Sequence, residues 1–177
     1  MKLYYFILGI VLLGVLFVFY YHLGGFKKIV VEKIEGQEPY EIRIWGKNFH
    51  GNIQDENWKK LFIETRDHIV KEKLQGPITV IYDKAPGGKG DNEKIDAFIG
   101  LPVPEGDTIP PGFTEKSFDF KGVLSVRLTM HTVVMPSPQK VKKIISRYAA
   151  MNNLHLDSLQ IEKYYPDNTL TVEVPFK

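Results

Sequence analysis

A β-hairpin is predicted by the stretch Ile161-Glu162-Lys163-Tyr164-Tyr165-Pro166-Asp167-Asn168-Thr169-Leu170-Thr171-Val172-Glu173-Val174-Pro175. Two short runs rich in β-branched and aromatic residues flank a Pro-Asp-Asn turn. A turn centred on Asp167 and Asn168 places Glu162 directly opposite Glu173. Like charges facing each other destabilise a sheet, so we expect a cation or a proton between them. A solvated hairpin with two exposed glutamates is the simpler alternative.

The N-terminus predicts a membrane helix. No residue from Leu3 to Tyr21 is charged, and a helix of this length spans about 28 Å, enough to cross the hydrocarbon core. Tyrosines cluster at both ends of the run, as in an interfacial aromatic belt. A signal peptide would also begin with Lys2 and an apolar stretch, but no small-x-small cleavage site follows. We therefore expect an uncleaved anchor at residues 1–23 and a linker at 24–28.

Charges beside the span predict its orientation. Lys27, Lys28 and Lys33 follow the span, whereas only Lys2 and the amino terminus precede it. Positive residues favour the cytoplasmic side. The expectation is a single-pass membrane protein whose soluble part, residues 29–177, is cytoplasmic.

Composition narrows the function of that soluble part. The net charge is +2, with cations and anions interspersed, and neither a basic stripe nor a helix-turn-helix pattern is present, so nucleic-acid binding is not expected. The chain has no cysteine, and its five histidines lack metal-ligand spacing. No metal or cofactor is therefore expected.

Hydrophobic periodicity indicates a duplicated order of elements, strand-helix-strand-strand. In the second half Ser137 and Pro138 have the types expected at a helix N-cap and first turn. The predicted class is α+β, with two pseudo-symmetric modules sharing an antiparallel sheet. The predicted strands are 40–45, 78–83 and 95–101 in the first half, and 123–129, 159–165 and 170–175 in the second.

Alternation along the strands predicts which face holds a ligand. The apolar residues should pack under the helices and the others should line a shallow groove on the opposite face. Such a mixture of aromatic and charged groups is typical of a small-molecule site, although a solvated outer face would look similar. The predicted groove residues are Arg43, Trp45, Ser125, Arg127, Thr129, Glu162, Tyr164, Thr171 and Glu173.

From about Ile29 to Phe176 the chain resembles the GyrI-like (gyrase-inhibitory-like) small-molecule-binding family. The resemblance rests on the duplicated element order, on Ile81-Tyr82-Asp83-x-x-Pro86, and on Ile161-Glu162-Lys163-Tyr164 followed by Val172-Glu173-Val174-Pro175. This family includes the effector-binding domains of bacterial AraC- and MerR-type regulators. The resemblance implies that Glu162 lies in an aromatic groove that receives cationic or polar ligands, with Glu173 as a second acid.

The same resemblance leaves other functions open. Some relatives look like hydrolases of strained electrophilic rings, and a membrane-anchored animal relative is an autophagy receptor of the endoplasmic reticulum. The chain has no DNA-binding domain, so a one-chain transcription factor is not expected.

Three functions follow from these residues. As a binding module, a membrane-anchored groove would capture an amphipathic or cationic molecule through Glu162, Glu173 and stacked rings. As a hydrolase, Glu162 would act as general base with Tyr164 or Tyr82 polarising the substrate. As an adaptor, the domain would bind a protein near the membrane. The binding module is the preferred interpretation, with these ligand-binding residues: Glu162, Tyr164, Glu173, Trp45, Tyr82 and Arg127.

Overall fold

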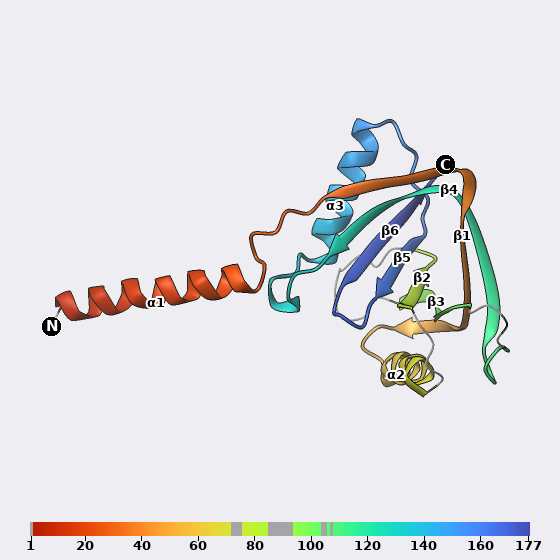
Figure 1. Ribbon diagram of the computed structural model, residues 1–177, viewed down its shortest axis with the longest axis horizontal. Coiled ribbons are helices and arrows are strands. Elements are labelled where there is room, and N and C mark those ends of the chain that lie inside the picture. The colour runs from red at the N-terminus through yellow and green to blue at the C-terminus, as the bar shows by residue number, and fades with distance from the viewer. Residues whose placement is uncertain (1, 72–75, 85–93, 104–105, 107) are drawn as a thin grey trace.

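The computed structural model describes residues 2–71, 76–84, 94–103, 106 and 108–177 (Figure 1). Helix α1 (Lys2–His22) projects away from the rest of the chain, and its large apolar side chains are exposed. Its length and composition suit a membrane span, and a signal sequence would share both properties. Pro86, part of the family resemblance, lies outside the described residues.

The described part of the chain forms an α+β domain in which six antiparallel strands close into a barrel. The barrel order is β1-β3-β2-β5-β6-β4. The strands are β1 (Val31–Asn52), β2 (Ile78–Tyr82), β3 (Lys94–Pro102), β4 (Thr114–Leu128), β5 (Gln160–Tyr164) and β6 (Leu170–Phe176). The predicted strand-helix-strand-strand order is confirmed in both halves, whereas the twofold relation between the halves stays a prediction.

Closure of the barrel depends on two long strands, β1 with 22 residues and β4 with 15. Both are longer than the strands predicted from the sequence. Strand β1 pairs with β4 along its first part and with β3 along its last part. A register shift between Glu35 and Tyr40 lets β1 bend. At the paired glycines Gly46 and Gly100 the two backbones approach so closely that an added Cβ would meet a carbonyl oxygen at 2.3 and 2.1 Å respectively.

Two helices pack on the outside of the barrel. Helix α2 (Glu56–Lys71) contributes Trp58 to a cluster with β2 and β3, and α3 (Pro138–Met151) packs Val141 and Ile145 on β4 and β6. The predicted N-cap of α3 is confirmed, because the Ser137 side chain accepts from the amide of Lys140. A short 3-10 helix, η1 (Thr132–Val134), connects β4 to α3.

The barrel interior holds a third apolar cluster. Ile42, Ile44 and Ile161 are buried there with Ile81 and Phe98. The prediction that the apolar strand residues pack under the helices was therefore wrong for Ile42, Ile44 and Ile161. Closure of the sheet creates a second dry face, so an apolar residue no longer identifies the side that the helices cover.

The register of the β5–β6 hairpin differs by one residue from the prediction. Glu162 pairs with Val172, and Glu173 pairs with Ile161. Because side chains alternate along a strand, this shift puts the two glutamates on opposite faces of the hairpin. Glu162 faces the helices with Val172, and Glu173 faces the barrel interior with Ile161.

The loop explains the shift. Asn168 has a left-handed backbone with φ of 62°, and the amide of Tyr165 donates to the carbonyl of Thr169 at 2.9 Å. These two features make a three-residue loop, in which a left-handed residue commonly precedes the second strand. The prediction assumed a two-residue centre.

Candidate functional site

The candidate site is a groove on the helix-covered side of the β5–β6 hairpin. It consists of two adjoining hollows that share Thr132, Met135 and Leu170, with volumes of about 580 and 300 Å³. The larger is bounded by α2 and the hairpin loop, and the smaller by the start of α3. Other lining residues are Phe62, Arg66, Tyr164 and Tyr165 in the larger hollow, and Val141, Gln160, Glu162 and Val172 in the smaller.

Alternation along β5 directs Gln160, Glu162 and Tyr164 to this side. Glu162 is only 8% exposed. The Tyr164 hydroxyl donates to its Oε2 at 2.5 Å, and the Gln160 amide donates to its Oε1 at 2.8 Å. The Tyr82 hydroxyl, from β2, also donates to Oε2 at 3.4 Å. The groove thus ends at a carboxylate that uncharged side chains hold in place.

No described Lys, Arg or His forms an ion pair with Glu162. Burial raises the pKa of Tyr82 and of Tyr164 well above its usual value, and the charge of Glu162 adds to both shifts. Both hydroxyls therefore remain protonated donors at neutral pH. The hydrogen-bond partners of the Glu162 carboxyl group within the described residues are therefore uncharged.

Aromatic rings form one wall of the groove. Phe62 of α2 contacts the ring of Tyr164 edge to face, with centroids 5.3 Å apart. Trp58 packs against Tyr82, with ring centroids 6.4 Å apart. Such pairs stabilise each other and fix the orientation of the hydroxyl-bearing rings. The site therefore has an apolar wall and a charged floor, a combination suited to an amphipathic molecule.

Glu173, predicted to face Glu162, lies inside the barrel and belongs to a different cluster. Lys163 Nζ approaches Glu173 Oε2 at 2.9 Å, and the Tyr40 hydroxyl donates to the same oxygen at 3.0 Å. Burial opposes the charge of Lys163, yet Glu173 and Tyr40 together raise its pKa above the usual value. Glu173 thus lies on the face opposite the helices, as predicted, whereas the register shift puts Glu162 on the helix-covered face, so the prediction that the two glutamates share one groove was wrong.

Three other predicted groove residues also lie outside this groove. Trp45 is buried, and its indole N–H donates to Glu115 Oε2 at 3.0 Å. Arg43 pairs with the same carboxylate at 2.6 Å. Arg127 is exposed, with its guanidinium 5.7 Å from the ring centre of Tyr165. None of these three residues lines either hollow of the groove.

The structure brings together Glu162, Tyr82 and Tyr164 of the predicted set and adds Gln160, Phe62 and Met135. Gln160 was recognisable from the sequence, because residues two apart on a strand share a face. The contributions of Phe62 and Met135 depend on how the helix and the loop pack, which periodicity does not specify.

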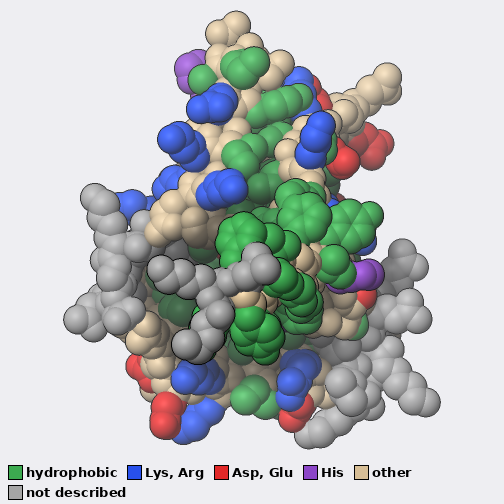
Figure 2. All heavy atoms as spheres, turned by 90° about the vertical axis from the view of Figure 1, so that its left-hand side faces the viewer, with side chains coloured by type: hydrophobic (Ala, Val, Ile, Leu, Met, Phe, Trp, Pro, Cys, Tyr) green, Lys and Arg blue, Asp and Glu red, His purple; other side chains and the backbone are tan. Residues whose placement is uncertain are grey.

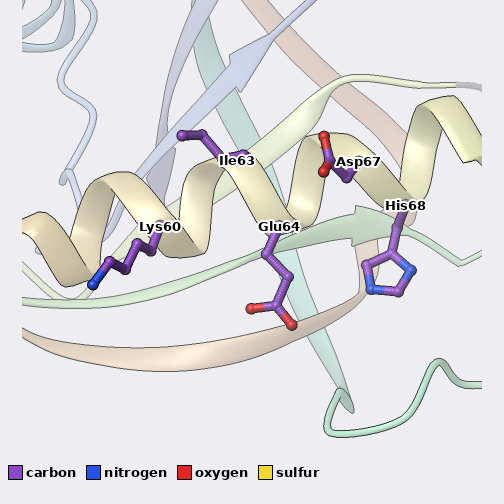
Figure 3. Close-up of a pocket in the computed structure, with 5 residues that line it drawn as sticks. All are labelled: Lys60, Ile63, Glu64, Asp67 and His68. Carbon is purple, nitrogen blue, oxygen red and sulfur yellow. The ribbon is translucent and has the colours of Figure 1, made fainter.

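A further hollow of about 320 Å³ lies on the outer side of α2 (Figure 3). All its lining residues come from that helix, and none is buried. Glu64 among them pairs with Lys47 at 2.6 Å. This surface lacks the buried polar group that distinguishes the groove.

Comparisons with known proteins support the fold. No family model and no curated protein matches the sequence. Among solved structures, the EcmrR C-terminal domain has a TM-score of 0.55 at 11% identity, covering 85% of this chain and 97% of that one. A hydrolase from Listeria innocua has a TM-score of 0.54 at 10% identity, covering 85% and 92%.

A third similar structure is SAV2435 bound to tetraphenylphosphonium, with a TM-score of 0.50 at 10% identity, covering 85% of this chain and 94% of that one. This likeness is one of fold. It shows that about 85% of this chain shares the fold of these solved structures.

Proposed function

We propose that this protein is a membrane-anchored binding module that captures an amphipathic organic cation in the groove between α2 and α3. Residues 1–23 anchor it, residues 24–28 link the anchor to the domain, and residues 29–177 form the binding domain on the cytoplasmic side. The carrying observation is the buried Glu162 carboxylate, held by the uncharged donors Gln160, Tyr82 and Tyr164.

The ligand class follows from the chemistry of the walls. A cation would gain a charge partner in Glu162 without displacing a protein cation, since no described cation pairs with that carboxylate. Its apolar part would contact Phe62, Met135 and Leu170. Aromatic faces also attract cations. The bound molecule in SAV2435, tetraphenylphosphonium, has this combination of positive charge and apolar surface.

The test is calorimetric titration of the full chain in detergent with tetraphenylphosphonium. Glu162→Gln keeps the shape and removes the charge. A charged contact contributes about 1.5–3 kcal/mol, so we expect affinity to fall about tenfold or more. Glu115→Gln is the matched control, because the Glu115 carboxylate lies outside the groove. The affinity of this variant for tetraphenylphosphonium should be unchanged.

The alternatives predict other outcomes. A hydrolase would turn over an epoxide in the same preparation and lose that activity with Glu162→Gln. An adaptor would neither bind nor turn over a broad panel of cations and electrophiles. Equal tetraphenylphosphonium affinity in Glu162→Gln and the unaltered chain would contradict the proposed role of Glu162.

A further inference from the structure

The linker after α1 is attached to the domain beside the groove. The carbonyl of Leu23 accepts from the amide of His131 at 3.0 Å. Lys27 Nζ donates to the carbonyl and the hydroxyl of Thr129, each at 3.1 Å. Thr132, the residue after His131, lines both hollows of the groove. The base of α1 is therefore adjacent to the rim of the groove.

The outer face of α3 is basic. Lys140, Lys143 and Arg147 are exposed and share the side of the helix opposite Val141 and Ile145, which are buried. The sequence of α3 contains no Asp or Glu. Within the described residues, none of the three cations forms an ion pair. We call these three residues the basic face.

The two views show basic side chains on the side of the molecule from which α1 projects. Helix α3 runs crosswise to α1 (Figure 1). Seen along α1, Lys and Arg side chains gather above the base of that helix, over α3 (Figure 2). If α1 crosses a bilayer, α3 lies roughly parallel to the membrane surface. Val133 of η1, at the groove rim, is 75% exposed on the connection between β4 and α3.

We propose that the basic face of α3 docks the domain onto the surface of an anionic bilayer. This inference rests on the proposed membrane anchor. Lys and Arg beside a membrane are attracted to anionic headgroups, and an amphipathic helix with a basic outer face suits such a surface. Docking turns the groove rim at Thr132 and Met135 toward the lipid interface. An anionic leaflet also concentrates amphipathic cations, so the groove would take its ligand from the membrane.

The experiment uses the full chain in lipid nanodiscs. The sequence has no cysteine, so Ala150→Cys, an exposed position on α3, gives a unique site for a fluorophore. The nanodiscs contain a nitroxide-headgroup lipid as quencher, in phosphatidylcholine alone or with about one third phosphatidylglycerol. We expect stronger quenching with phosphatidylglycerol, and expect 1 M salt to remove most of the difference, because the Debye length falls to about 3 Å.

Replacing the basic face by Lys140→Gln, Lys143→Gln and Arg147→Gln should lower quenching to the phosphatidylcholine value. The control is Lys94→Gln, Lys121→Gln and Lys177→Gln, which removes three charges from the barrel strands and the C-terminus and should leave quenching unchanged. Equal quenching in the two lipids, or in the basic-face variant and the parent, would overturn the proposal.

Two accompanying measurements separate this proposal from the proposed function. Resistance to alkaline extraction tests the anchor alone, and tetraphenylphosphonium titration in detergent tests the groove alone. An anchored, ligand-binding chain whose quenching ignores lipid charge would refute docking and leave the binding function intact. A chain that docks but does not bind would refute the groove assignment only.

Discussion

The two faces of the β5–β6 hairpin each bury a glutamate, and the two glutamates differ in the charge of their partners. Glu173, on the interior face, is 3% exposed and paired with Lys163. Glu162, on the groove face, is 8% exposed and is held by uncharged donors. The charge of a buried carboxylate is balanced when a cation of the protein pairs with it, and removing either partner leaves an uncompensated charge. A carboxylate without one retains its capacity to attract a cation from outside. The two glutamates are therefore similar in burial and differ in the charge of their partners, and the proposed binding role of Glu162 depends on that difference.

The largest effect is expected from Glu173→Gln. This change leaves Lys163 charged and largely buried next to Tyr40, and breaking a buried pair destabilises a protein by about 3 kcal/mol or more. Urea unfolding in detergent micelles measures the loss. Combining it with Lys163→Met should restore part of the stability. A loss below about 1 kcal/mol would mean that the interior pair is as dispensable as a surface one, and the contrast between the two faces would disappear.

Glu162→Gln should affect ligand affinity much more than the stability of the fold. We expect its affinity for tetraphenylphosphonium to fall about tenfold or more, but its free energy of unfolding in urea should change by less than about 1 kcal/mol. The reason is that a glutamine oxygen can still accept from Tyr164 while the cost of burying a charge is removed. If Glu162→Gln destabilises the fold as much as Glu173→Gln, the groove carboxylate is structural and the comparison fails.

The left-handed backbone of Asn168 belongs to the loop whose register puts the two glutamates on opposite faces. A residue with a Cβ in the left-handed region is strained by roughly 1 kcal/mol, and Asn tolerates it better than Ala. Asn168→Ala should therefore lower the free energy of unfolding by about 0.5–1 kcal/mol, and Asn168→Gly should keep or slightly raise it. A loss with glycine equal to that with alanine would show that the Asn side chain, rather than the backbone, holds the loop.

The smallest effect is expected from pH in the neutral range. Burial raises the folded-state pKa of Tyr82 and Tyr164. Burial opposes the charge of Lys163, but its contacts with Glu173 and Tyr40 outweigh burial and raise its pKa. A raised pKa gives stability that is fully present below the unfolded value and is lost as pH rises through the folded one. Stability due to these groups should thus stay constant from about pH 7 to 9 and fall above about pH 10. Urea titrations at each pH measure this, and Tyr164→Phe should reduce the alkaline slope. An unchanged slope would contradict the role of Tyr164.

Local features of the fold were predictable from the sequence. The apolar run of α1, the N-cap Ser137 and the periodicity of each strand depend on neighbouring residues, and the order of elements follows from them. Closure of the barrel was not predictable in this way, because it depends on the length of β1 and on the close approach of Gly46 and Gly100. These contacts join parts of the chain about fifty residues apart.

The candidate site was predicted in part for the same reason. Glu162 and Tyr164 are two residues apart, so their shared face follows from alternation. Tyr82 joins them only through the pairing of β2 with β5. The face predicted for Glu162 and Tyr164 was wrong, because the loop with the left-handed Asn168 shifts the register by one residue and reverses the side chains of β5 relative to those of β6.

The place of the last hairpin in the barrel has a consequence for synthesis of the protein. β5 and β6 lie between β2 and β4, so β2 pairs with β5 and β4 pairs with β6. Until residues 160–176 leave the ribosome, one side of β2 and one side of β4 have no strand to pair with. Unpaired strand edges recruit other chains, and partly folded domains with such edges aggregate. A chain that stops before the hairpin would have two unpaired strand edges, so truncation before residue 160 is expected to promote aggregation.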